Sequence, residues 1–527
     1  MDDLMAFSRK YWVYLAIFLL SLAMKLMLLS AASVVNRDAM VYIAAAQKFS
    51  CGMFAEGIQH YPMPLYPLLL AALHLVVPDW ILAGRLLSLI PLLLCLVPVY
   101  FLTLRLFDQD SARAAILLFA VLPVFNTPVT GVVRDPLFLL CALGTLAAVA
   151  QYNYRSTFKA LAGAVILAVL ATLMRIEGVL LLALVPALYV WEKRKNFSAR
   201  YLFQALGALL GALLILALTV WGFSIFGIAS QSRLPEAFEW FKGLITLDIL
   251  SNYHALMAEL KQFQQQLPAA DLRNNILESA RHYAPIIYAL GLTEILIKEV
   301  FPTSLLALWG LRFYSEGEQN ISALSPSRAI IVWPWIMFVA LNLLFCMVHN
   351  FTTTRYMRVP IALSLPFVAR GISLWWRKLQ PRKGLAWILM GVFFITPALK
   401  TMGYASKKTE DHCIRVAGEW VQQHDPHKQL RLLFSDRRLM VYADRVDAYY
   451  SADHADCFAP QSDCIQTIDM ALILRKQTQK LEYPVGFAEL ARFESGDEVV
   501  VVWGKLGTDT SVPTMEEAHR DAPAGNE

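Results

Sequence analysis

A single carboxylate, Asp38, follows the first long apolar run of the sequence, which covers roughly residues 11–30. It lies in the segment Asn36-Arg37-Asp38, beside a cation and where the chain should leave the membrane. A carboxylate at this level can accept the proton of a hydroxyl group, as a general base does. An Asp in front of a helix-forming segment is also a common N-cap. Position alone leaves both roles open.

Three further groups of ionisable residues fall at the ends of apolar runs, on the side of the membrane predicted for Asp38. They are Arg134 with Asp135, Arg175 with Glu177, and His349 with Arg355, Tyr356 and Arg358. Ionisable residues at membrane depth are costly and often mark a functional site. For any one arginine, anchoring to lipid headgroups is the simpler explanation. Four groups on one face favour a shared polar site.

The composition defines the elements that must position these residues. The chain has 527 residues, of which 57% are hydrophobic and 17% charged, against roughly a quarter charged in soluble proteins. Apolar runs recur from the N-terminus to about Gly403 and predict an all-α polytopic membrane bundle over residues 1–404. We predict about eleven spans, at 11–30, 84–104, 112–132, 136–152, 158–174, 177–191, 201–226, 296–312, 329–348, 359–376 and 384–402.

Loop charges predict the orientation of the bundle. The shorter apolar segment 65–77 is flanked by prolines, so we interpret it as a re-entrant or interfacial helix. Basic residues then cluster in the inner loops, and the N-terminus is cytoplasmic. If 65–77 is instead a span, everything after it is inverted. With eleven spans the C-terminal part lies outside the inner (plasma) membrane, in the periplasm or the extracellular space.

Two regions outside the spans have compositions of their own. In the outer segment 227–295, residues 234–260 and 272–290 show the periodicity of amphipathic helices. Residues 405–507 resemble a small α/β domain, with a helix at 411–423 and strands at 430–434, 470–474 and 499–502. The last residues, 508–527, are polar and predicted to be disordered. Outside the cytosol, Cys457 and Cys464 form the nearest pair for a disulfide.

These residues suit a substrate with an isoprenoid tail and a sugar phosphate. The tail dissolves in the bilayer, and the sugar's anomeric carbon then lies just outside it. Asp38 would deprotonate the acceptor hydroxyl, while Arg175, Arg355 and Arg358 would stabilise the polyprenyl phosphate that leaves. A single displacement inverts the anomeric configuration. Retention needs a second, nucleophilic carboxylate, for which Asp135 and Glu177 are candidates, so the stereochemistry stays open.

An ordered set of short motifs carries a family resemblance. In chain order they are Asp38 with Tyr42 and Ala46, Tyr61 to Val77, Ala83 to Ser88, Asp135-Pro136, Arg175-Ile176-Glu177-Gly178, and Arg355-Tyr356 before Pro360. Together they resemble the membrane glycosyltransferases of the GT-C superfamily, in the group of bacterial protein O-mannosyltransferase-like enzymes and lipid A aminoarabinose transferases. The likeness covers about the first 400 residues well and the tail loosely.

The resemblance implies roles for individual residues. Asp38 would be the general base of an inverting reaction, Asp135 would hold the first loop or the acceptor, and Arg175 and Arg355 would contact the donor phosphate. Residues expected to support the site are Arg37, Tyr42, Tyr61, Glu177, His349 and Tyr356. The first loop carries one acid where protein mannosyltransferases often carry two, so the acceptor (lipid A, polysaccharide or protein) is open.

The partners predicted are thus a polyprenyl-phosphate sugar donor, a glycan, lipid or protein acceptor and the lipid bilayer. Nucleic acid is not expected, because the net charge of +5 comes from basic residues in short loops. No cluster of outer His and carboxylate residues has metal-ligand spacing, so no essential metal or other cofactor is predicted.

Two other classes of protein compete with this interpretation. A transporter or flippase predicts charged residues within spans, broken helices in matching halves and an internal repeat. The acids here lie at span ends, and no repeat is visible. A membrane scaffold gives no reason for the acids and arginines to share a face. The sequence favours a glycosyltransferase.

Overall fold

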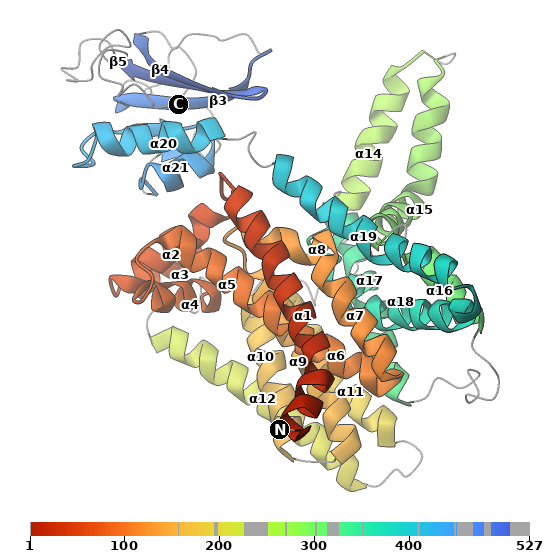
Figure 1. Ribbon diagram of the computed structural model, residues 1–527. Coiled ribbons are helices and arrows are strands. Elements are labelled where there is room, and N and C mark those ends of the chain that lie inside the picture. The colour runs from red at the N-terminus through yellow and green to blue at the C-terminus, as the bar shows by residue number, and fades with distance from the viewer. Residues whose placement is uncertain are drawn as a thin grey trace.

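A bundle of apolar helices carries a small mixed α/β domain at one end in the computed structural model (Figure 1). The structure describes residues 2–155, 158–193, 199–225, 251–268, 271–300, 303–313, 326–349, 353–407, 412–446, 449–450, 467–478 and 486–505. The helices of the bundle and its loops are α1 (Asp2–Ala31), α2 (Ala39–Ser50), α3 (Phe54–His60), α4 (Leu65–His74), α5 (Trp80–Leu94), α6 (Leu96–Leu106), α7 (Gln109–Val121), α8 (Pro123–Asn126), η1 (Thr127–Thr130), α9 (Asp135–Arg155), α10 (Phe158–Met174), η2 (Ile176–Gly178), α11 (Val179–Lys193), α12 (Ala199–Ile225), α14 (Ser251–Gln266), α15 (Arg273–Val300), α16 (Thr303–Gly310), η6 (Leu311–Phe313), α17 (Pro326–His349), α18 (Arg358–Leu379), η8 (Gln380–Arg382) and α19 (Lys383–Lys407).

Within the described residues, five helices are long and apolar enough to cross a membrane. They are Tyr11–Ala31, Trp80–Leu106, Arg328–His349, Arg358–Leu379 and Lys383–Ser406, and α7 with α8 and η1 makes a sixth if the bent pair is one span. Shorter apolar helices are Leu65–His74, Asp135–Gln151, Lys159–Met174, Ile176–Trp191 and Phe203–Leu214. The chain is therefore a multi-pass, mostly helical membrane protein, as predicted. The count of about eleven rests on the shorter helices.

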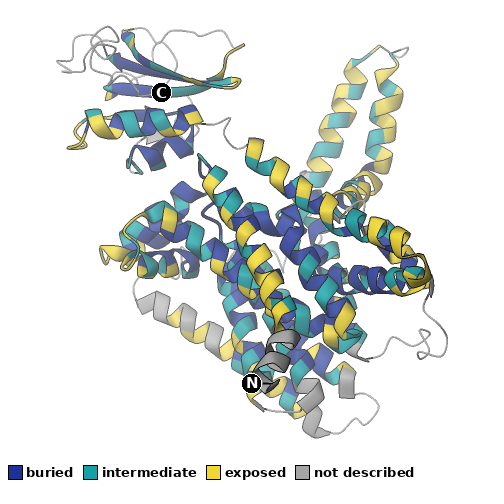
Figure 2. Cartoon of the chain, viewed as in Figure 1, coloured by how far each residue is buried: buried dark blue, intermediate teal, exposed yellow. Residues whose placement is uncertain are grey.

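The surface of the bundle agrees with a lipid environment. Figure 2 shows exposed residues along α1 and α19. Many of them are large and apolar, such as Trp12 and Leu15 on α1 and Trp387 and Ile388 on α19. Water would make such a surface costly, whereas a bilayer solvates it.

The predicted span 112–132 is not straight. The axes of α7 and of α8 with η1 differ by 68°, because Pro123 has no N–H to continue the helix. The freed carbonyl groups of residues 120–122 accept bonds from Asn126 Nδ2 (2.9 and 2.8 Å) and Thr401 Oγ1 (2.6 Å). The buried Lys25 donates to Asn126 Oδ1 at 2.9 Å. Side chains of α1 and α19 thus hold the bend.

Two other segments refine the predicted topology. The segment 65–77 forms α4, a helix of 10 residues followed by the highly exposed Leu75 and Val76; it is shorter than the ~20 residues a span needs. The predicted span 296–312 covers the end of α15 and the start of α16, and residues 301–302 between them lie outside the described residues.

The predicted outer segment 227–295 contains a helical hairpin. Helices α14 and α15 pack against each other and rise from the bundle on the side where the C-terminal domain lies (Figure 1). Residues 262–266, which lie between the two predicted helical ranges, form the last part of α14. Residues 226–250, with most of the predicted helix 234–260, lie outside the described residues.

The C-terminal domain pairs two helices with a five-stranded sheet. Its helices are α20 (His412–His424) and α21 (Arg437–Tyr442), and its strands are β1 (Leu432–Phe434), β2 (Tyr449–Tyr450), β3 (Met470–Lys476), β4 (Phe487–Ser495) and β5 (Glu498–Lys505). The sheet order is β2-β1-β3-β5-β4, with β1 parallel to β2 and β3, and β5 antiparallel to both β3 and β4. The apolar run of β5 is buried on both faces, as in an inner strand.

The sequence predicted α20 and the strands β1, β3 and β5, with shifted ends. It did not predict β4, whose charged residues Glu489, Arg492 and Glu494 interrupt the apolar pattern. Cys457, Cys464 and residues 508–527 lie outside the described residues. Cys413 is buried in α20.

Candidate active site

The predicted site residues come from four separate segments of the chain. Asp38 precedes α2, Asp135 begins α9, and Arg175 and Glu177 lie at the turn between α10 and α11. Arg355 and Arg358 lie where the chain enters α18. The structure brings these six residues together, and we call them the Asp135 cluster.

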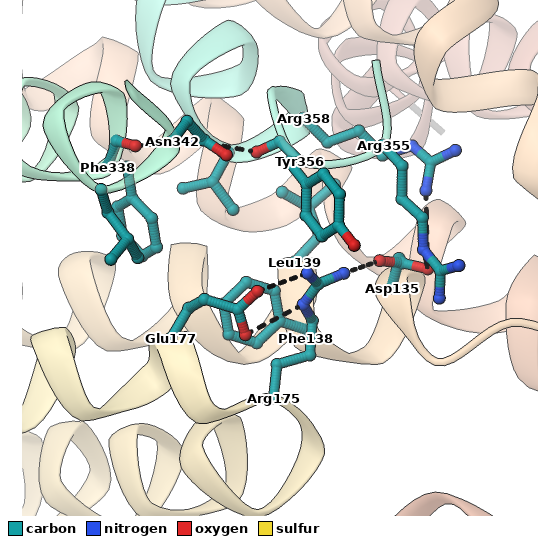
Figure 3. Close-up of a pocket in the computed structure, with 12 residues that line it drawn as sticks. Asp135, Phe138, Leu139, Arg175, Glu177, Phe338, Asn342, Arg355, Tyr356 and Arg358 are labelled. Atoms are coloured by element: carbon teal, nitrogen blue, oxygen red, sulfur yellow. Dashed lines mark hydrogen bonds and ion pairs between the residues drawn. The ribbon is translucent and has the colours of Figure 1, made fainter. Parts of the chain in front are cut away.

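Arg175 and Asp135 are the two buried members of the Asp135 cluster. The guanidinium of Arg175 donates to Asp135 Oδ1 through Nη1, and to the two carboxylate oxygens of Glu177 through Nη2 and Nε (Figure 3). Only 4% of the Arg175 side chain is exposed. The plane of the guanidinium also lies over the rings of Phe138 and Tyr356, at 5.5 and 5.0 Å from their centroids. Both edges of the arginine fork are therefore occupied by carboxylates.

Arg355 bridges the two aspartates of the cluster. Its Nε lies 2.7 Å from Asp135 Oδ2, and its Nη1 donates to Asp38 Oδ2. Burial alone would lower the pKa of the Arg355 guanidinium, but Asp135, Tyr42 and Asp38 raise that pKa above its ordinary value. Arg355 therefore stays charged.

Arg358 completes the charges around Asp135. Its Nη1 lies 3.7 Å from Asp135 Oδ2. Asp135, with 4% of its side chain exposed, thus faces three arginines. A buried carboxylate with this many cations stays ionised.

Asp38 differs from Asp135 in its exposure. It occupies the N-cap position of α2, but its side chain accepts no capping hydrogen bond, so the N-cap role that the sequence left open does not occupy the carboxylate. Its side chain is 45% exposed, while its backbone is held at a helix start. A carboxylate that is fixed in place and open to solvent can reach an acceptor group.

Tyrosines form one wall beside this carboxylate. The buried Tyr42 accepts a hydrogen bond from Arg355 Nη2 at 3.3 Å. The rings of Tyr61 and Tyr66 meet the ring of Tyr42 edge-on, at centroid distances of 4.9 and 5.0 Å. The segments 36–42 and 61–66 are therefore packed together.

A cleft opens at the Asp135 cluster. Its empty volume is about 370 Å³, including space open to solvent. The lining combines charged residues with apolar ones, namely Asp135, Phe138, Leu139, Arg175, Glu177, Phe338, Leu341, Asn342, Arg355, Tyr356, Arg358 and Val359. The lining therefore offers both ion-pairing groups and apolar surface.

Two predicted support residues lie away from the charges of the cluster. Arg37 points to the C-terminal domain, where its Nε lies 3.2 Å from Asp436 Oδ2. His349 is exposed at the end of α17, and its ring contacts Phe345, which in turn contacts Tyr356. From their positions in the sequence, Arg37, His349 and Tyr356 were all expected at the site. Of the three, only Tyr356 lines the cleft.

Several residues at the site were not among the predicted set. Asn342 Nδ2 donates to the carbonyl of Tyr356 at 3.2 Å, which holds the turn before Arg358. Asn36 Oδ1 accepts a bond from Val132 N at 2.8 Å and thereby ties the Asp38 loop to the segment before Asp135. Asn342 could have been singled out in the sequence, because it is an amide within the apolar run of α17. Nothing in the spacing of the sequence points to the role of Asn36.

Within the described ranges, no group of three or more His, Cys, Asp or Glu side chains is arranged to hold a metal ion. The carboxylates of the Asp135 cluster face arginines instead. The Asp135 cluster is thus a network of ion pairs between three carboxylates and three arginines.

A family comparison covers part of the Asp135 cluster. The profile of the family described as dolichyl-phosphate-mannose-protein mannosyltransferase matches residues 60–221, which include Asp135, Arg175 and Glu177. The chain resembles the GT-C glycosyltransferases, as its motifs predicted. The match to this GT-C family begins after Asp38 and ends before Arg355. A search of curated proteins finds no significant match.

Solved GT-C structures share the fold. ArnT from Cupriavidus metallidurans bound to undecaprenyl phosphate is 13% identical, with a TM-score of 0.54 over 93% of this chain and 98% of that one. The Archaeoglobus fulgidus oligosaccharyltransferase in complex with Zn and sulfate is 12% identical, with a TM-score of 0.54 over 87% of this chain and 67% of that one. At this identity the likeness concerns the fold.

Proposed function

We propose that this protein transfers a sugar from a polyprenyl-phosphate donor to an acceptor hydroxyl on the outer face of the inner (plasma) membrane, with inversion. One observation carries the proposal. A half-exposed carboxylate, Asp38, shares its arginine with the buried Asp135 at a cleft that is part charged and part apolar. The likeness to mannosyltransferases and to an ArnT bound to undecaprenyl phosphate supports the donor class.

The chemistry balances as a single displacement. Asp38 accepts the proton of the acceptor hydroxyl, whose oxygen attacks the anomeric carbon. The bond from that carbon to the phosphate oxygen breaks, and polyprenyl phosphate leaves. Arg355 and Arg358 stabilise the charge that develops on this phosphate. Asp135 and Glu177 already pair with buried arginines, which leaves neither of them poised as a nucleophile for retention.

The structure supports different roles for the three arginines of the Asp135 cluster. Arg175 is buried, with both edges of its fork on carboxylates. We therefore assign it to holding Asp135 and Glu177, in place of the direct phosphate contact predicted from the family. Arg355 and Arg358 are more exposed, at 27% and 15% of their side chains, and both line the cleft.

The direct test is sugar transfer by the purified full chain in detergent or vesicles. Polyprenyl-phosphate sugars are offered as donors, and the anomeric configuration of the product is read by NMR. We expect transfer with inversion from at least one such donor. A product with retained configuration would overturn the assigned mechanism, and consistent use of nucleotide sugars alone would overturn the donor class.

The orientation is part of the proposal. We propose that the segment 296–312 and the shorter apolar helices other than Leu65–His74 also cross the membrane, to give about eleven spans with the N-terminus in the cytoplasm. The bundle (1–404) then presents the α/β domain (405–507) outside. Reporters active only in the cytosol or only after export, fused at Glu527, test this. A signal from the cytosolic reporter alone would place the cleft on the wrong face.

A further inference from the structure

The loop that carries Asp38 is held by the C-terminal domain. Tyr442, at the end of α21, accepts a hydrogen bond from Val35 N at 2.9 Å and donates one to the carbonyl of Ser33 at 3.2 Å. Asp436, which caps the start of α21, lies 3.2 Å from Arg37 Nε. Three alternate residues before Asp38 thus contact one short helix that lies 400 residues away in the sequence.

Tyr442 is suited to hold two backbone groups at once. Its side chain is buried, and burial raises the pKa of its hydroxyl above the ordinary value. The hydroxyl is therefore protonated at neutral pH and can donate one bond while it accepts another. Without it, Val35 N would be left buried at this interface, which is costly.

The helix that presents Tyr442 is itself fixed. Asp436 accepts from Arg438 N at 2.8 Å and also pairs with the Arg438 guanidinium at 3.0 and 3.1 Å. Helix α20 crosses α21 closely at Gly418, where an added Cβ would lie 2.4 Å from the Cβ of Tyr442. Ser435 Oγ accepts from Leu474 N of β3 at 2.7 Å. The position of Tyr442 therefore follows from the packing of the whole domain.

The membrane bundle holds the other side of the same loop. Arg85 Nη2 donates to the carbonyl of Ala32 at 3.1 Å. Asn36 lies against Gly131, where an added Cβ would be 2.6 Å from Asn36 Oδ1. The residues before Asp38 are thus fixed between two bodies, the bundle and the C-terminal domain.

We propose that Tyr442 and Asp436 are positioning residues, through which the C-terminal domain sets the place of Asp38 at the cleft. This inference rests on the proposed function, because it matters for catalysis only if Asp38 is the base. A base must lie within hydrogen-bond reach of the proton that it removes. A displacement of about 1 Å can lower a rate by roughly 100-fold.

The test compares two small changes in two backgrounds. Tyr442→Phe keeps the ring and removes both hydrogen bonds of the hydroxyl, and Arg37→Gln removes the contact with Asp436 from the exposed side. Each is made in the natural chain and in Asp38→Asn. Turnover number and donor binding are measured on the same preparation. Asp444→Asn, an exposed residue of the same domain that pairs with Lys428, is the matched control.

We expect Tyr442→Phe to lower kcat by between about 10- and 100-fold, Arg37→Gln to lower it less, and donor binding to change by less than about twofold. In the Asp38→Asn background Tyr442→Phe should lower the residual rate no further. Asp444→Asn should match the natural chain.

Normal kcat in Tyr442→Phe would overturn the inference. An equal loss of kcat in both backgrounds, or a parallel loss of donor binding, would also overturn it, because either result would mean that Tyr442 supports the fold in general. The proposed function fails separately. Normal turnover in Asp38→Asn alone would remove the base, whereas an inactive Asp38→Asn with a normal Tyr442→Phe removes only this inference.

Discussion

The two ends of α18 carry similar charges in different settings. Arg358, at its start, belongs to the Asp135 cluster, while Arg370 and Arg377 lie about 18 and 28 Å further along the helix axis and pair with Asp108. We call Asp108, Arg370 and Arg377 the Asp108 cluster. The distance is close to the thickness of a bilayer core, ~30 Å. Each cluster joins an aspartate at a helix start to arginines from α18 or the turn before it.

The difference lies in what the aspartate already does. Asp108 Oδ1 caps α7 by accepting from Ser111 N at 2.8 Å, and its Oδ2 accepts from Arg377 at 2.8 Å. Asp38 holds the same N-cap position on α2 without such a bond, and it pairs with Arg355, which lines the cleft. A capping carboxylate is held by backbone N–H groups, whereas a half-exposed carboxylate that caps no helix keeps oxygen atoms available for chemistry.

The largest effect that tests the difference between Asp38 and Asp108 is expected when Asp38 is neutralised. Asp38→Asn keeps the size of the side chain and removes its basic oxygen. We expect sugar transfer to fall by about 10²–10⁴-fold, while the protein still inserts and binds donor. Transfer from a polyprenyl-phosphate donor and donor binding are measured together. Turnover close to normal in a well-expressed variant would move the base elsewhere, with Asp135 next in line.

Arg355 tests the link between the two aspartates. Arg355→Ala should weaken use of the donor by about 2–5 kcal/mol, because a desolvated charge pair with the phosphate is lost. Arg355→Lys should restore only part of it, since an ammonium cannot make the two-bond contact of a guanidinium. The donor concentration dependence of transfer is the measurement. An unchanged dependence in Arg355→Ala would make this residue a headgroup anchor.

A substitution in the Asp108 cluster should lower the stability of the protein and leave its turnover nearly unchanged. Asp108→Ala removes a helix cap and a partner of two arginines, so we expect a loss of about 1–3 kcal/mol in unfolding free energy. Thermal unfolding in detergent measures it. The turnover of the folded protein should stay within about twofold. Asp110→Ala, the exposed neighbour 3.8 Å from Arg377, is the control and should have little effect. A turnover loss as large as that of Asp38→Asn would erase the contrast between the clusters.

Tyr42 should give the smallest change. Its hydroxyl accepts one long hydrogen bond from Arg355, at 3.3 Å. Tyr42→Phe should cost about 0.5–1.5 kcal/mol, which is roughly a two- to tenfold loss in donor use. The same change in Arg355→Ala should have no further effect, because the bond is already absent. A larger loss there would show that Tyr42 acts on its own.

Sequence predicted the helices better than their breaks. Apolar length alone located most helices of the bundle, since a bilayer requires it. The bend at Pro123 was missed, because the carbonyls that it frees are capped by Asn126 and by Thr401 from α19, nearly 300 residues later. A proline can end or bend a helix, and only its surroundings decide which.

The same limit applies to the site. Asp135, Arg175 and Arg355 stood out because several groups of ionisable residues fall at span ends on one predicted face. Their pairing did not follow from the sequence, because an arginine can pair with any carboxylate and the tertiary fold decides which one lies within reach. Arg37 shows this most clearly. It was expected beside Asp38 in the site, yet its partner is Asp436, 399 residues away.

The charges of the Asp135 cluster bear on how the enzyme lets its product go. Three carboxylates, Asp38, Asp135 and Glu177, already balance three arginines, so each guanidinium faces an acid before any lipid arrives. An incoming phosphate gains only the difference between its own attraction and that of the acids it displaces. Under the proposed function, polyprenyl phosphate is then bound weakly after transfer, and each acid pairs with its arginine again when the lipid departs. Turnover benefits from binding that is modest in the ground state.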